Sequence, residues 1–266
     1  YEKAVPNELS FREKLTAAGE AGFDALEISV DESDWRLARL DWTKQQRAEL
    51  LAATRDTGVY INSMCLSGHR KYPLGSSDPD AVRRGLGIME KAVELSYDLG
   101  VRIIQLAGYD VYYEDSTEET CRRFSENLVK AVNMAAARGV ILAFETMETP
   151  FMNTIEKAMV HVHNVNSPYL QVYPDMGNIS NGASNVAADI ASGKGHIVAA
   201  HLKETAPGVF RDMQFGEGRV DFQLVTDCLK AQGVSLYTAE FWYHDGDDWR
   251  VELKRTHNFL RPYLEG

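Results

Sequence analysis

The chain has 266 residues, of which 44% are hydrophobic and 25% charged, a composition typical of a globular protein with a large core. Its net charge of −11 argues against nucleic acid as a partner, because neutralising phosphates requires a basic face. No apolar run approaches the roughly 18 residues that span a membrane, and the three cysteines are too widely spaced for a disulfide framework. We therefore expect a cytoplasmic protein without nucleic-acid or membrane partners.

One pattern repeats along the chain: an amphipathic stretch ends in glycine, and a short apolar run follows it. Glycine ends a helix at low cost, and a short apolar run is typical of a strand that is buried on both faces. We predict seven strands, near residues 25–30, 60–66, 103–106, 141–144, 170–173, 197–200 and 236–239. Only the run at 170–173 lacks a preceding glycine, and Asn166-Ser167-Pro168 introduces it instead.

Eight helices are predicted between these strands, beginning near residues 10, 43, 79, 117, 154, 185, 221 and 249. Several of these positions carry side chains that cap helix N-termini. The predicted caps are Ser10 with Glu13, Thr43 with Gln46, Ser116 with Glu119, Asp78 before Pro79, and Asn153 with Glu156.

Strands that alternate with helices predict a parallel α/β fold, here a single TIM (β/α)8 barrel over residues 1–266. The doubly wound alternative usually has a glycine-rich phosphate loop after its first strand, and this chain contains neither G-x-G-x-x-G nor G-x-x-x-x-G-K-[ST]. A complete barrel has a strand before its first helix. We therefore expect that the first strand lies largely upstream of Tyr1 and is missing from this chain.

Four successive predicted strands are each followed by a side chain that can bind a metal: Glu145, Asp175, His201 and Glu240. The carboxyl ends of barrel strands share one rim, so these side chains are expected to meet there. A single strand-end carboxylate is more often a helix cap or an ion-pair partner, and a single histidine is more often a hydrogen-bonded core residue. Three carboxylates together would repel one another, and a divalent cation relieves that repulsion. The series therefore predicts a metal site.

This ligand set resembles that of the xylose-isomerase-like barrels. Within that group the sequence is similar to the L-xylulose 5-phosphate 3-epimerases, a family also named L-ribulose 5-phosphate 3-epimerases. The resemblance covers nearly the whole chain, and its most specific stretches are YEKA (1–4), SMCLSGHR (63–70), QLAGYDVYY (105–113), YPDMGN (173–178) and FGEG (215–218).

The resemblance implies a metal-dependent 3-epimerase that interconverts L-xylulose 5-phosphate and L-ribulose 5-phosphate. It implies one divalent ion (Zn, Mn, Mg or Co) bound by Glu145, Asp175, His201 and Glu240, with Glu145 and Glu240 also acting as the catalytic bases. Epimerisation at carbon 3 removes the proton alpha to the ketone and returns one to the opposite face through an enediolate, so two bases and an electrophile suit it. A homodimer that takes part in L-ascorbate degradation is also implied.

Basic side chains near the predicted rim favour an anionic sugar. The free-ketose 3-epimerases place Glu, His and Arg near the ligands, and the corresponding stretches here, 149–151, 177–178 and 206–207, lack that set. We instead expect His69, Arg70 and Lys203 to bind the phosphate, and Tyr109 and Asn178 to contact the substrate. Two other interpretations stay open: His69, Arg70 and Lys71 belong to a solvated loop, or Lys203 pairs with a ligand carboxylate.

Two other functions also stay open. The same metal site could serve an aldose–ketose isomerase acting on a hexulose 6-phosphate, or the barrel could bind a sugar without catalysis. A metal-dependent endonuclease is disfavoured because the chain has few histidines and no basic face for DNA.

Overall fold

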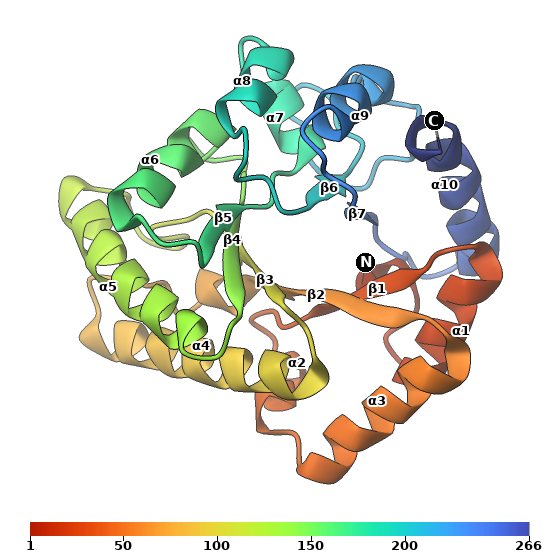
Figure 1. Ribbon diagram of the computed structural model, residues 1–266, viewed down its shortest axis with the longest axis horizontal. Coiled ribbons are helices and arrows are strands. Elements are labelled where there is room, and N and C mark those ends of the chain that lie inside the picture. The colour runs from red at the N-terminus through yellow and green to blue at the C-terminus, as the bar shows by residue number, and fades with distance from the viewer. Residues whose placement is uncertain (266) are drawn as a thin grey trace.

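The computed structural model describes residues 1–265 and shows parallel strands at the centre with helices around them (Figure 1). Strands β1 to β5 form one sheet in chain order, and β6 pairs with β7. Two isolated bridges, Val172 with Ile197 and Asp175 with His201, join β5 to the β6 side. The strands are β1 (Ala25–Ser29), β2 (Tyr60–Leu66), β3 (Ile103–Ala107), β4 (Ile141–Glu145), β5 (Leu170–Val172), β6 (Ala200–Leu202) and β7 (Tyr237–Ala239). The parallel α/β barrel predicted from the sequence is confirmed.

Helices form the outer layer: α1 (Phe11–Ala21), α2 (Asp34–Leu37), α3 (Lys44–Thr57), α4 (Pro79–Leu99), α5 (Glu118–Ala136), α6 (Ile155–Val165), α7 (Met176–Gly182), α8 (Val186–Ser192), α9 (Phe222–Lys230) and α10 (Trp249–Leu264). Eight of them lie where the sequence predicts helices. The two that the sequence did not predict, α2 and α7, are short, and α7 contains glycine and asparagine, which are poor helix formers. None of the described helices combines the length and apolarity needed to cross a membrane.

The helix caps are largely as predicted. Ser10 and Thr43 each form a complete capping box, and Asp78 caps α4 ahead of Pro79. Two predicted caps are wrong by one residue. Thr117 rather than Ser116 caps α5, and Thr154 rather than Asn153 caps α6. The displaced side chains have other partners, since the Ser116 hydroxyl donates to Asp110 and the Asn153 amide oxygen accepts from Lys157 Nζ.

The sixth strand differs most from its prediction. The apolar run 197–200 was expected to be the strand, with His201 following it, but β6 starts at Ala200 and includes His201. The chain changes hydrogen-bond partner along this run: Val198 N donates to Val172 O of β5 (3.0 Å), and from Ala200 onward the backbone pairs with β7. Regular pairing therefore begins only at the end of the apolar run.

The largest apolar cluster lies between the strands and the surrounding helices. Leu26 and Ile28 of β1 belong to this cluster, and Glu27 between them points the other way because strand side chains alternate. The barrel interior therefore receives polar groups, among them Glu27, Ser63 and Tyr173, which are all buried and connected by hydrogen bonds.

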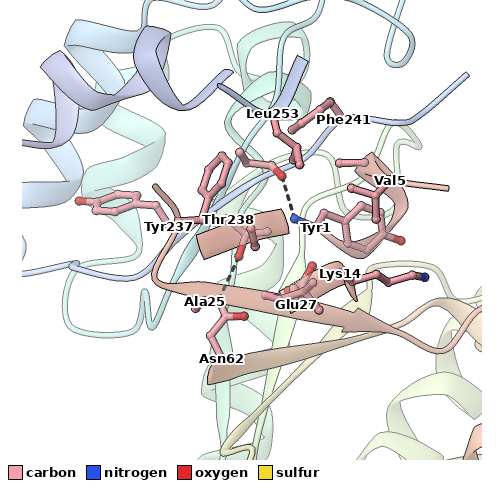
Figure 2. A pocket seen from close by; sticks show the side chains of 15 residues that line it. Tyr1, Val5, Lys14, Ala25, Glu27, Asn62, Tyr237, Thr238, Phe241 and Leu253 are labelled. Atoms are coloured by element: carbon pink, nitrogen blue, oxygen red, sulfur yellow. Dashed lines mark hydrogen bonds between the residues drawn. The ribbon is translucent and has the colours of Figure 1, made fainter. Parts of the chain in front are cut away.

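A pocket lies between β1 and β7, and within residues 1–265 these two strands do not pair (Figure 2). Tyr1 lies in this interval, with its backbone nitrogen 3.1 Å from Ala239 O of β7 and its hydroxyl donating to Ser29 of β1 at 3.2 Å. Asn62 of β2 donates to Thr238 of β7 at 3.2 Å on the same side, as Figure 2 shows. The additional strand expected before Tyr1 stays a prediction.

Candidate metal centre

Four neighbouring strands bring Glu145, Asp175, His201 and Glu240 together. Each residue offers one ligand atom, and these atoms all lie within 4.8 Å of one another. Glu145 is the last residue of β4, His201 lies within β6, and Glu240 directly follows β7. Asp175 follows β5 and caps α7, because its Oδ1 accepts the backbone N–H of Asn178 at 2.6 Å. That hydrogen bond leaves Asp175 Oδ2 to face the other three residues.

A buried hydrogen-bond chain orients His201. Its Nε2 lies 2.8 Å from Glu27 Oε1, and Glu27 Oε2 accepts the hydroxyl of Ser63 at 2.7 Å. With the Nε2 proton donated to Glu27, Nδ1 faces the carboxylates of Glu145 (3.2 Å), Glu240 (3.4 Å) and Asp175 (4.0 Å). A carboxylate behind a histidine ligand fixes its tautomer and the orientation of its ring.

The electrostatics of the cluster favour added positive charge. Burial opposes protonation of His201, but the negative charges of Glu27 and Glu240 outweigh it and raise the pKa of His201 well above its usual value. Burial also raises the pKa of Asp175 to about 7, although the nearby Lys203 ammonium opposes this. Burial opposes ionisation of Glu240 too, but Lys203 and His201 hold the pKa of Glu240 well below its usual range.

The donor set fits a divalent cation. Asp175 Oδ2 and Glu240 Oε2 are buried, the nearby cation is the Lys203 ammonium (3.0 and 3.4 Å), and both oxygens belong to the cluster that His201 Nδ1 faces. Three carboxylates and one imidazole suit Zn²⁺, Mn²⁺, Co²⁺ or Mg²⁺. Glu145, Asp175, His201 and Glu240 are thus the residues that would hold the metal.

A pocket beside the cluster is lined by both acidic and basic side chains. Glu145, Asn178 and Glu240 line it together with four basic side chains, Lys3, Arg70, Lys203 and Arg211. Tyr1, Cys65, Ser67, Met147, Glu148, Phe210 and Trp242 complete the lining. Lys3 pairs with Asp31 (2.6 Å) and Lys203 pairs with Asp175 (3.0 Å), whereas Arg70 and Arg211 form no ion pair within residues 1–265. These two guanidinium groups favour an anionic ligand at this pocket.

The predicted substrate residues have different surroundings. Arg70 lines the pocket, its guanidinium lies over Tyr112 and Tyr109 (5.2 and 5.8 Å to the ring centroids), and its buried Nε donates no hydrogen bond. Asn178 also lines the pocket, and its side-chain amide donates to Thr146 O. Tyr109 lies behind Arg70 and donates its hydroxyl to Glu148 at 2.8 Å. Arg70 and Asn178 are therefore placed to touch a ligand, and Tyr109 supports Arg70.

Lys203 and His69 differ from their predicted roles. Lys203 Nζ lies 3.0 Å from Asp175 Oδ2 and 3.4 Å from Glu240 Oε2, so its charge is already balanced by the carboxylates, the alternative left open above. His69 does not line the pocket: its Nε2 lies 3.0 Å from Gly85 O, and burial lowers its pKa. Because its Nε2 contacts a helix carbonyl outside the pocket, His69 is not placed to touch a ligand there.

Sequence reasoning missed Glu27, Lys3 and Arg211. A signal for Glu27 was present, since a charged residue interrupts the apolar run of β1. Lys3 comes from the short 3₁₀ helix Glu2–Ala4 and Arg211 from the loop before α9, and only the fold brings them to one pocket.

Comparison with known proteins gives concordant results. Residues 15–263 match the family model described as a xylose isomerase-like TIM barrel. The L-ribulose-5-phosphate 3-epimerases UlaE of Salmonella heidelberg (strain SL476) and Escherichia coli O157:H7 are each 47% identical over 266 residues, 99% of this chain and 93% of theirs.

Solved structures of similar fold include D-psicose 3-epimerase from Clostridium cellulolyticum H10 with D-tagatose, with a TM-score of 0.80 and 19% identity over 97% of this chain and 94% of that one. An L-ribulose 3-epimerase has a TM-score of 0.77 and 22% identity over 96% of this chain and 89% of that one. At these identities the likeness concerns the barrel fold.

Proposed function

The chain belongs to the xylose isomerase-like TIM barrel family, and from this premise we propose that it epimerises carbon 3 of a pentulose 5-phosphate, interconverting L-xylulose 5-phosphate and L-ribulose 5-phosphate. The observation that carries the proposal is the buried convergence of Glu145, Asp175, His201 and Glu240 beside a pocket rich in basic side chains.

The arrangement of the two glutamates suits a two-base reaction. Glu145 and Glu240 come from β4 and β7, the outer strands of the four that build the cluster, with Asp175 and His201 between them. One carboxylate takes the proton from carbon 3, and the other returns a proton to the opposite face. A divalent cation, when bound, stabilises the negative charge that develops on the substrate oxygens during this exchange.

Lys203 assists by keeping Glu240 charged. Its ammonium lies between Asp175 and Glu240, and it lowers the pKa of Glu240, so that this side chain is ionised and able to accept a proton at neutral pH. Arg70 is the strongest candidate for holding the 5-phosphate, because a guanidinium can donate two parallel hydrogen bonds to phosphate oxygens. The homodimer and the cytoplasmic location expected from the sequence stay predictions.

The decisive experiment follows a pentulose 5-phosphate by NMR in D₂O with protein and added Mn²⁺, Mg²⁺, Co²⁺ or Zn²⁺. Deuterium entering at carbon 3, with formation of the 3-epimer, is the expected result. Exchange at carbon 1 would indicate an aldose–ketose isomerase, and absence of exchange at every carbon would indicate a sugar-binding barrel. Full activity after exhaustive chelation would contradict the role of the metal.

A further inference from the structure

The loop between β6 and α9, residues 203–221, reaches the pocket although most of it is exposed. Phe210 and Arg211 from its middle line the pocket beside Glu145 and Glu240. The Arg211 guanidinium lies 5.5 Å from the ring centroid of Trp242, which follows β7. Surface loops are more mobile than the elements they connect, so a buried contact within this loop would restrict where Phe210 and Arg211 lie.

Glu204 provides that anchor. Its side chain is 2% exposed, and its two carboxylate oxygens accept three backbone N–H groups of the loop. Oε1 accepts from Thr205 (3.1 Å) and Val220 (3.1 Å), and Oε2 accepts from Gly216 (2.8 Å). The carboxylate therefore joins the two ends of the loop, since residues 205 and 220 flank the segment that enters the pocket.

The FGEG turn at residues 215–218 is shaped around this carboxylate. A Cβ on Gly218 would lie 2.4 Å from Glu204 Oε1 and 2.3 Å from Thr205 O, so only glycine permits the close approach. Gly216, whose N–H binds the carboxylate, has a φ of +90°, a conformation that other residues rarely adopt. Both glycines of the motif thus serve the contact with Glu204.

The loop is also hydrogen-bonded to α7, the helix that Asp175 caps. Thr205 Oγ1 donates to Gly177 O of α7 at 2.9 Å, and Arg219 N donates to Thr205 O at 2.8 Å. Lys203, which precedes Glu204, contacts Asp175 and Glu240. Thr205 and Lys203, which flank Glu204, therefore connect the anchor to α7 and to the carboxylates of the cluster.

We propose that Glu204 is a positioning residue that, through the N–H groups of Thr205, Gly216 and Val220, holds the β6–α9 loop so that Arg211 binds the anionic end of the substrate. This inference rests on the proposed function for its substrate. Glu204 does not line the pocket, so it acts on substrate binding only through the loop.

The first test needs no substrate. Hydrogen exchange is measured by mass spectrometry on peptides covering residues 205–221 of the full chain. In Glu204→Gln one of the two acceptor oxygens is replaced by an NH₂ group, which cannot accept a hydrogen bond from a backbone N–H. Exchange in these peptides should therefore rise about tenfold, while exchange in peptides from β1 to β5 stays unchanged. Glu217→Gln, an exposed carboxylate of the same turn, is the matched control and should behave as wild type. Unchanged exchange in Glu204→Gln would overturn the anchor.

The second test separates binding from turnover. With the pentulose 5-phosphate, Glu204→Gln should raise KM about tenfold and keep kcat within about threefold. Arg211→Ala should raise KM as much as Glu204→Gln does. The double variant should have the same KM as Arg211→Ala alone, because both substitutions remove the same interaction between Arg211 and the substrate. Additive losses, or a fall in kcat alone, would contradict positioning through Arg211.

A second variant protects the result against misfolding. Gly218→Ala leaves the carboxylate in place but pushes the turn away from it, and it should reproduce both the faster exchange and the higher KM. Faster exchange with an unchanged KM in both variants would show that the loop does not serve the substrate. If the wild type fails to exchange carbon 3, the proposed function is wrong, and the substrate-free exchange still decides whether Glu204 anchors the loop.

Discussion

Glu145 and Glu240 are each both a candidate metal ligand and a candidate base, so the conservative change to glutamine tests them best. Either Glu145→Gln or Glu240→Gln should lower kcat by about 10²–10⁴-fold, because a positioned proton acceptor is lost. The measurement is kcat together with metal content of the purified variant. Glu156→Gln, which changes an exposed carboxylate of α6 away from the pocket, is the control. A glutamine variant that keeps its metal and a near-normal kcat would remove that residue from the mechanism.

Substitution of Glu27 tests whether its contact with His201 contributes to metal binding. Its Oε1 lies 2.8 Å from His201 Nε2, so Glu27→Gln removes the charge that orients the ring and makes it a better ligand. Affinity for the divalent metal should fall about 10–100-fold by titration calorimetry. Asp24→Asn, which changes an exposed carboxylate just before β1, should leave affinity unchanged. Equal affinities in the two variants would show that Glu27 plays no part in metal binding.

Substitution of Arg70 tests whether its guanidinium binds the 5-phosphate of the substrate. Charge-assisted hydrogen bonds contribute about 1.5–3 kcal/mol each, so Arg70→Ala should raise KM for the pentulose 5-phosphate about ten- to a hundredfold. For the unphosphorylated pentulose the change should matter little, since no dianion is present. Lys71→Ala is the neighbouring control, because Lys71 is exposed and lies over Tyr72 rather than in the pocket. An equal rise in KM for both sugars would show that Arg70 does not bind the phosphate.

The convergence of Glu145, Asp175, His201 and Glu240 could be predicted for a physical reason: parallel strands deliver their carboxyl ends to one rim, so regular spacing along the chain becomes proximity in space. From the sequence, His69 and Arg70 have the same expected role, but neighbours in a 3₁₀ helix point in different directions, and Ser67–Arg70 form such a turn. Arg70 faces the pocket while His69 contacts α4. A run of basic residues therefore indicates charge but not direction.

The sequence predicted which helices and strands the chain forms more accurately than the residues at which they begin and end. Gly22, Gly58 and Gly100 end helices in the left-handed conformation, as the repeated pattern predicts. Asn166, with a φ of +50°, takes the same role ahead of β5, where the sequence lacks glycine. The caps of α5 and α6 were displaced by one residue because adjacent polar side chains compete, and local sequence does not show which of them has another partner.

The α6 cap gives a prediction at this scale. Thr154 accepts the backbone N–H of Lys157 at 3.3 Å, so Thr154→Ala should lower the free energy of unfolding by about 1 kcal/mol. Thr154→Ser keeps an acceptor at the same place and should stay within a few tenths of wild type. Urea unfolding followed by circular dichroism measures both variants. If Thr154→Ala unfolds at the wild-type midpoint, the cap contributes nothing to the stability of the molecule.

For the whole molecule, the repeat of strand and helix was enough to predict a barrel, but the buried ion cluster around Glu2 was not visible in the sequence. Glu2 comes from the short 3₁₀ helix Glu2–Ala4, yet its carboxylate is fully buried. Arg39 Nη1 lies 2.5 Å from Oε2, Lys14 Nζ lies 3.4 Å from Oε1, and the backbone N–H of Ser29 donates to Oε2 at 2.7 Å. These groups come from four separate elements, and only the folded chain brings them together.

This cluster sets an expectation for acid stability. Burial opposes ionisation of Glu2, but Arg39 outweighs it and holds the pKa of Glu2 below its usual value. A carboxyl group whose folded pKa is lowered contributes stability above its unfolded pKa of about 4.3, and this contribution is lost as the pH falls through the folded pKa. The free energy of unfolding should therefore fall on acidification below about pH 4.3, partly because of Glu2.

Glu2→Gln removes the charge while keeping the shape. Arg39 and Lys14 would then be buried without a counter-ion, so the variant should be less stable at pH 7 by about 3–5 kcal/mol. Its stability should also fall less steeply in acid than that of the wild type, since the variant has no Glu2 carboxyl to protonate. Denaturant unfolding between pH 7 and pH 3 measures both effects, with the exposed Glu8→Gln as control. Curves for wild type and Glu2→Gln that stay parallel across this range would show that the cluster does not couple folding to pH.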